Sequence, residues 1–269
     1  MPASSRILVA ICAATAAAAA LSGCGGDERG DSSAPLLAPA ATTSSKAEPY
    51  ADLSARELLD RAETGMRDSG AMTVDLTGTD EGAAMHVKAA LTTEGRCAVA
   101  ASVDGDTFQI IGTGAGAYVK GDADFWRDNA SDGADGDTAA DRLAGKWARL
   151  SEQEFTDSGL DYFCVLDELL DDMTSDDDKG TLTKNLPTTL DGKPVIPLVH
   201  TTSDGTTTIY VSTGDTPYVV KSESTGGDSP DVGLYSDFGK PPHIAAPPPS
   251  LTVDPGDLGG DQDGGGFRV

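Results

Sequence analysis

Apolar and polar residues recur with two different periods along this chain, and the first is helical. From residue 54 to residue 67 apolar side chains return every three or four positions, which predicts an amphipathic helix. Asp52 or Ser54 can cap its start, and Gly70 can end it. The residues that form its apolar face are Leu58, Leu59, Ala62 and Met66.

Beyond Gly70 the period changes to two, which is typical of half-buried strands. An Asp-Gly pair at 104–105 stands between two such runs and indicates a hairpin. We therefore expect antiparallel meanders on both sides of residues 151–173. The alternating or short apolar runs cover residues 72–77, 85–91, 97–103, 107–111, 116–120, 146–150, 193–201, 206–212, 218–223 and 232–238.

The middle of the chain separates the two sets of strands. Residues 121–141 are rich in Asp, Gly and Ala, and we expect a long acidic loop with at most a short helix at its end. Residues 151–173 have a helical period in two pieces, and Ser151 with Glu154 matches a capping box. Helices in two blocks, rather than alternating with strands, predict an α+β domain.

The N-terminus reads as an export signal. A single positive residue, Arg6, precedes a short, mostly alanine stretch and then Leu-Ser-Gly-Cys at 21–24, which resembles the lipobox of bacterial lipoproteins. We expect residues 1–23 to be a signal peptide and Cys24 to carry the lipid that holds the protein on the outer face of the cytoplasmic membrane. The alternative is an ordinary secretory peptide with an incidental cysteine.

Composition then divides the rest of the chain. Residues 24–50 are predicted to form the lipidated cysteine and a flexible tether, residues 51–240 one domain, and residues 241–269 a disordered tail rich in Pro, Gly and Asp. In an oxidising compartment the remaining cysteines, Cys97 and Cys164, are expected to form a disulfide, with two buried free thiols as the alternative.

The charge excludes one class of partner. The chain has 44 acidic and 19 basic residues, a net charge of −25. Since proteins bind nucleic acids largely by neutralising phosphates with Lys and Arg, we expect no nucleic-acid partner. Most of the carboxylates are expected to be solvated surface groups.

Local sequences in both meanders resemble the LppX/LprG-type lipoproteins of actinobacteria, relatives in fold of the lipoprotein carrier LolA. The resemblance covers residues 54–247. It implies a strongly curved, incompletely closed antiparallel sheet of about ten strands, covered on its concave face by two or three helices. The segments that carry it are Gly116–Gly121, Phe125–Trp126, Gly145–Leu150, Leu190–Val195, Thr208–Ser212, Pro217–Lys221 and Tyr235–Gly239.

The resemblance also implies an apolar cavity between sheet and helices that accepts lipid acyl chains. For each residue of the expected lining, ordinary core packing is the alternative interpretation. The expected lining residues are Met72, Val74, Leu76, Met85, Val87, Phe108, Ile110, Ile209, Val211, Tyr218 and Val220.

The sequence offers no visible catalytic apparatus. His86, His200 and His243 do not stand in a nucleophile motif, and we expect no enzymatic activity, cofactor or metal. The aspartates of residues 122–137 have poor spacing for calcium, because Ala130 occupies a ligand position of an EF-hand loop that begins at Asp128. The expected function is a membrane-anchored protein that binds, carries or presents a lipid or another apolar ligand. The alternative is an envelope sensor or interaction module that binds a protein partner.

Overall fold

A single open sheet organises the protein in the computed structural model, which describes residues 48–80, 82–129, 136–174, 180–226 and 231–254. Within these residues the sheet has thirteen strands. The first half contains β1 (Ala71–Asp80), β2 (Ala83–Thr92), β3 (Cys97–Val103), β4 (Asp106–Gly112), β5 (Ala117–Gly121) and β6 (Trp147–Leu150). The second half contains β7 (Thr181–Lys184), β8 (Thr188–Leu190), β9 (Lys193–Thr201), β10 (Gly205–Ser212), β11 (Val219–Gly226) and β12 (Asp231–Ser236).

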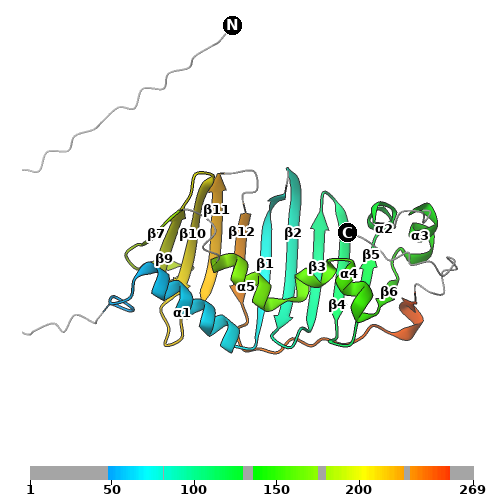
Figure 1. Ribbon diagram of the computed structural model, residues 1–269, viewed down its shortest axis with the longest axis horizontal. Coiled ribbons are helices and arrows are strands. Elements are labelled where there is room, and N and C mark those ends of the chain that lie inside the picture. The colour runs from blue at the N-terminus through cyan, green and yellow to red at the C-terminus, as the bar shows by residue number, and fades with distance from the viewer. Residues whose placement is uncertain (1–47, 81, 130–135, 175–179, 227–230, 255–269) are drawn as a thin grey trace, which may run out of the picture. The chain divides into compact units, whose positions relative to one another are not determined.

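The two halves meet in the middle of the sheet, where β1 pairs antiparallel with β12. From there the order runs to β6 at one end and to β7 at the other, with β8 paired to β9 beside it (Figure 1). A two-residue strand, β13 (Thr252–Val253), pairs parallel with β6. The end strands β13 and β7 do not pair with each other, so the predicted α+β fold with an unclosed, mostly antiparallel sheet is confirmed.

Tight turns between neighbouring strands follow the sequence closely. Asp104 and Gly105 both have positive φ angles, 49° and 101°, and so do Asp191 and Gly192, at 49° and 76°. Two successive residues of positive φ twist a hairpin in the same sense as its strands, and Asp-Gly is one of the pairs that adopt this conformation readily. The predicted hairpin at 104–105 is therefore present, joining β3 to β4.

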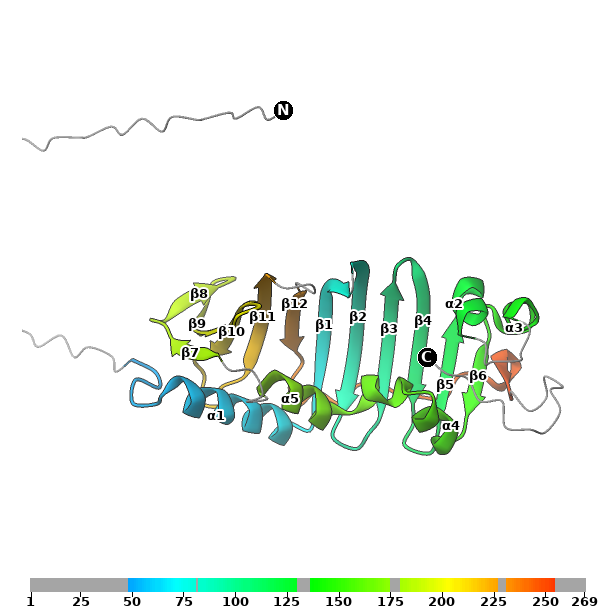
Figure 2. The ribbon, with the colours of Figure 1, turned by 45° about the horizontal axis from the view of Figure 1, so that its top comes forward.

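Helices cover one face of this sheet. The first, α1 (Ala55–Asp68), begins at Ser54, whose hydroxyl accepts a hydrogen bond from the Glu57 amide while the Glu57 carboxylate accepts one from the Ser54 amide. The other helices of this cover are α4 (Glu152–Asp157), the 3₁₀ helix η1 (Leu160–Cys164) and α5 (Leu166–Thr174). Figures 1 and 2 show α1, α5 and α4 crossing the strands on the same side of the sheet, near the same strand ends.

The acidic segment after β5 is more structured than we expected. It contains α2 (Ala123–Asp128) and α3 (Gly136–Leu143), separated by residues outside the described part. Asp122 explains the first helix, because its carboxylate accepts a hydrogen bond from the Phe125 amide at 2.9 Å and so caps the helix N-terminus. A buried Phe125 and Trp126 then hold α2 against the sheet.

The first part of the expected C-terminal tail, residues 241–254, is placed along the sheet. The Gly239 amide donates to the Ala71 carbonyl, and Arg96 donates to the Ile244 carbonyl at 2.6 Å. Ile244 is buried, and η2 (Pro249–Leu251) leads into β13. A segment rich in proline, with few amide donors of its own, is thus fixed by donors and acceptors of the sheet and its turns. Residues 255–269 lie outside the described residues.

The predicted signal peptide, Cys24 and most of the tether also lie outside the described residues. In the part of the chain that the structure describes, no helix combines the length and the apolarity needed to cross a membrane.

Candidate functional site

The helix-covered face of β1–β5 is apolar in every strand. Strand register aligns Leu76 with Val87, Val87 with Ala101 and Ala101 with Phe108 across the first four strands. The alternate residues, such as Asp75 and Lys88, point to the opposite, polar face. The sheet therefore presents a continuous apolar surface to its helices.

The expected lining residues belong to this surface, with one exception. Met72, Val74, Val87, Phe108, Ile110, Ile209 and Val211 are buried in one hydrophobic cluster, and Leu76, Met85 and Tyr218 are half-buried against it. This placement is compatible with both of the interpretations given above, core packing and a ligand-binding surface.

Val220 is the exception, because the pairing of β10 with β11 is irregular. The register shifts between Tyr210 and Val211, so that Val211 stands opposite Val219. Val219 is fully buried, while Val220 is half-buried and takes no part in the cluster. A β-bulge inserts one extra residue into a strand, so the residues beyond it point to the opposite face of the sheet from the one that strict alternation predicts. Alternation counted from Tyr218 therefore chose Val220 where the structure buries Val219.

Directly beneath the helices, the chain's own side chains occupy the interior. Leu58 and Met66 of α1 and Leu166 and Leu170 of α5 are fully buried. They pack in the same cluster as large residues of the sheet such as Met72. This part of the interface is a well-filled protein core.

Further from α1, toward the β1–β2 and β3–β4 turns, the same face is incompletely covered. Leu76, Met85 and Val103 there are half-buried, as is Phe163 of η1, which lies edge-on to Phe108 with 5.8 Å between ring centroids. We call these four residues the apolar rim. They combine apolar surface that is open to solvent with direct contact to the buried core.

The cover is joined to the sheet by the disulfide that we predicted. Cys97 of β3 and Cys164 of η1 are bonded, and both are buried. Gly112 of β4 provides the room, because a Cβ atom at that position would lie 2.8 Å from the Cys97 Sγ atom.

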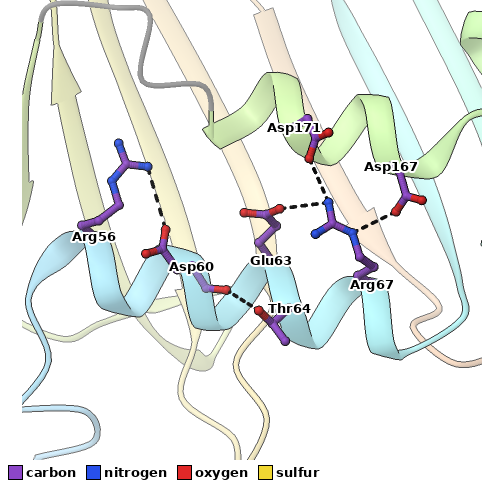
Figure 3. A network of polar contacts seen from close by, with 7 residues as sticks. All are labelled: Arg56, Asp60, Glu63, Thr64, Arg67, Asp167 and Asp171. Carbon is purple, nitrogen blue, oxygen red and sulfur yellow. Dashed lines mark hydrogen bonds and ion pairs between the residues drawn. The ribbon is translucent and has the colours of Figure 1, made fainter.

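An arginine joins the two long helices of the cover (Figure 3). Arg67 of α1 donates from Nε to Asp167 of α5 at 2.8 Å and from Nη2 to Asp171 of α5 at 2.9 Å. Its Nη2 atom also lies 3.0 Å from the Glu63 carboxylate, within α1. The hydrogen bond to Asp167 and the neighbouring carboxylates raise the pKa of Arg67, so its charge is secure. Arg67 therefore links α1 to α5 by ion pairs at the protein surface.

One polar pair is buried in the apolar face. The hydroxyl groups of Ser222 and Tyr235 lie 3.2 Å apart, and burial raises the pKa of Tyr235. Gly233 lies beside them, since a Cβ atom there would be 2.7 Å from Ser222 Oγ and 2.8 Å from the Tyr235 hydroxyl. Only the fold reveals this pair, because the two residues come from different strands.

The described residues do not gather a set of three or more His, Cys, Asp and Glu side chains that could hold a metal ion. His86 lies on the polar face, exposed, with its Nε2 atom 2.8 Å from Asp75. His200 is half-buried on β9, and His243 is exposed. None of these positions suggests a reaction.

Three solvent-open pockets lie at the margins of the described fold. One of about 270 Å³ adjoins Glu48, Pro49, Leu186 and Pro187 near β7. Another, of about 310 Å³, lies beside Arg149 and Asp254 at the β6 end. A third, of about 230 Å³, lies against Cys164 and the glycine-rich ends of β4 and β5.

Comparison with known proteins gives similar structures without a matching sequence family. No family model matches the chain, and neither does any curated protein sequence. The lipoprotein LppX of Mycobacterium tuberculosis is similar at 12% identity and a TM-score of 0.42, with 71% of this chain and 98% of that chain covered. LprF of Mycobacterium bovis is similar at 10% identity and a TM-score of 0.44, with 74% and 99% covered.

A LolA superfamily protein of Nitrosomonas europaea, NE2245, is similar at 11% identity and a TM-score of 0.23, over 75% of this chain and 98% of that one. The solved structures that resemble this chain thus include LppX, LprF and a LolA-superfamily protein, at identities and scores too low to assign a function.

Proposed function

We propose that this chain is a membrane-anchored, extracytoplasmic lipoprotein that binds, carries or presents a lipid or another apolar ligand on the helix-covered face of its sheet. The apolar rim carries this proposal. Its four side chains form an apolar surface that is continuous with the core and that the described residues leave partly uncovered. An apolar ligand would complete that cover.

The energy available there is large for a small contact. Each methylene group moved from water against such a surface contributes about 0.8 kcal/mol, so a few methylenes contribute several kcal/mol. Neutral apolar groups also suit the site better than anionic groups, since a strongly acidic protein repels anions.

Cys24 supplies the anchor in this proposal. Two acyl chains on one residue give nearly irreversible membrane attachment, whereas one chain does not. Mass spectrometry of the N-terminal peptide from membranes should find the lipidated cysteine, and Cys24→Ser should release the protein from the membrane fraction. An unmodified Cys24 would contradict the anchor.

Ligand binding is tested on the purified full chain by organic extraction and by uptake of a fluorescent fatty acid. Met85→Asp places a carboxylate in the rim, and that carboxylate would lose hydration beside a bound acyl chain. Uptake should weaken at least tenfold, which corresponds to a loss of about 1.4 kcal/mol in binding free energy. Ala84→Asp is the matched control, since Ala84 is the next residue of β2 and is exposed on the other face. No extracted lipid together with no uptake would refute the proposal.

A second candidate function follows from the polar face of the sheet. Leu234 is 48% exposed and Val232 37% exposed on β12, between ion-paired side chains of the neighbouring strands. An apolar pair with a charged surround is typical of a protein contact. If the chain is an interaction module, Leu234→Glu should abolish binding of a stoichiometric protein partner and leave fatty acid uptake unchanged.

A further inference from the structure

An unusually exposed leucine stands at the β7 end of the sheet. Leu186, in the short connection between β7 and β8, is 80% exposed, the highest value among the large exposed hydrophobic residues of the described chain. Single exposed leucines are common on protein surfaces. The surroundings of this one, however, have three further properties.

The connection that carries Leu186 is held firmly. The Asn185 amide donates to the Pro197 carbonyl at 2.9 Å, and Pro187 has a fixed φ angle and favours an extended backbone at Leu186. Directly afterwards, β8 pairs with β9. The loop therefore holds the leucine side chain away from the core, and little backbone freedom is lost when a partner buries that side chain.

The chain that comes from the N-terminus joins the domain at the same place. Glu48 and Pro49 line one pocket together with Leu186 and Pro187. Lys184 of β7 fixes this junction, because its ammonium group donates to the carbonyl of Tyr50 at 2.9 Å and to that of Leu53. The attachment point of the upstream segment is thus adjacent to the exposed leucine.

The local charge also differs from that of the chain. Residues 180–203 contain Lys184 and Lys193 against Asp191, and Glu48 lines the same pocket as Leu186, so the net charge here is zero in a protein of net charge −25. Lys193 is exposed beside β8. This end of the sheet is therefore repelled less by a negatively charged lipid surface than most of the acidic surface is.

We propose that the β7–β8 end docks on the outer leaflet of the membrane that holds the chain, with Leu186 inserted among the lipids. This inference rests on the proposed lipid anchor at Cys24. The inference also rests on the predicted tether, because a flexible chain of that length would span ~25 Å on average and allow the β7–β8 end to reach the surface. Docking by this end would place β6 and β13, at the other end of the strand order, away from the membrane.

The test uses the full lipidated chain in vesicles of phosphatidylcholine with a minority of phosphatidylglycerol. Thr188→Cys, labelled with an environment-sensitive fluorophore, reports from β8 next to the loop. The emission should rise severalfold and be quenched by lipid-borne quenchers. Leu186→Ser in the same labelled chain should reduce the inserted fraction roughly tenfold, because transfer of one leucine side chain from water is worth about that factor.

Leu251→Cys, labelled in the same way, is the control, because Leu251 is 50% exposed and precedes β13 at the opposite end of the sheet. Its emission should remain that of an aqueous label. If the protein floats with the vesicles but the Thr188 label stays aqueous, or if Leu186→Ser changes nothing, the docking surface is refuted. If the protein does not float, the Cys24 anchor fails and the inference fails with it. Ligand uptake is a separate measurement that neither result decides.

Discussion

Removal of the disulfide between β3 and η1 tests how the helical cover is held on the sheet. Cys97→Ala with Cys164→Ala deletes the bond and keeps both positions apolar, as their burial requires. The two cysteines are 67 residues apart in sequence, and closing a loop of that length removes unfolded-state entropy worth about 4 kcal/mol. For a domain of this size that loss corresponds to a melting temperature lower by about 8 to 16 °C.

Urea unfolding and thermal melts of the double variant, each with and without reductant, measure the effect. The wild type in reductant should approach the double variant, and the double variant should be insensitive to reductant. Hydrogen exchange should accelerate most in residues 160–174, because η1 and the start of α5 lose their covalent connection to β3. The expected loss in the free energy of unfolding is about 4 kcal/mol. A double variant whose free energy of unfolding lies within about 0.5 kcal/mol of that of the oxidised wild type would refute the loop-closure reasoning.

Two further predictions concern the helices. Arg67→Met removes the cation that joins α1 to α5 and should lower the free energy of unfolding by about 1 kcal/mol, a loss that shrinks in high salt because the pairs are partly exposed. Arg56→Met, whose described ion pair with Asp60 lies within α1 and does not reach α5, should change it much less, and equal losses in urea titrations would contradict this role of Arg67. Asp122→Ala should cost about 1 to 2 kcal/mol, since its carboxylate caps α2 and accepts from the amide and hydroxyl of Thr107. Burial raises the pKa of Asp122, but hydrogen bonds led by that of the Phe125 amide leave it lowered. Its stabilisation is therefore present above the unfolded-state pKa and is lost as pH falls through the folded-state pKa, so a variant whose deficit persists at low pH would contradict this role.

Local sequence rules foretold most of the regular elements. The helical spacing of Leu58, Leu59, Ala62 and Met66 and the cap at Ser54 gave α1 to within a residue of its observed end, since capping and amphipathicity act over a few neighbouring positions. Asp104 and Gly105 gave a hairpin for the same reason. These features depend on the residues beside them, and so they are visible in a sequence.

The features that escaped prediction depend on distant residues. The bulge that exchanges Val220 for Val219 arises in the pairing of β10 with β11, which a period of two cannot show. The placement of residues 241–254 relies on donors such as Arg96, far away in the chain. For the candidate site, ten of the eleven expected lining residues lie in or against the apolar cluster, but alternation could not distinguish the half-buried rim from the core beneath the helices.

The seam between β1 and β12 has a consequence for the order of assembly. From β1 to β6, each strand pairs with the strand that follows it in sequence. The pairing of β1 with β12 instead joins Thr73 to Ser236, across most of the domain sequence. Such distant pairing carries a loop-closure cost that local hairpins avoid, and it slows folding. A chain that emerges N-terminus first can pair β1–β5 as local hairpins at once. The pairing of β1 with β12 must wait until nearly the whole polypeptide has emerged.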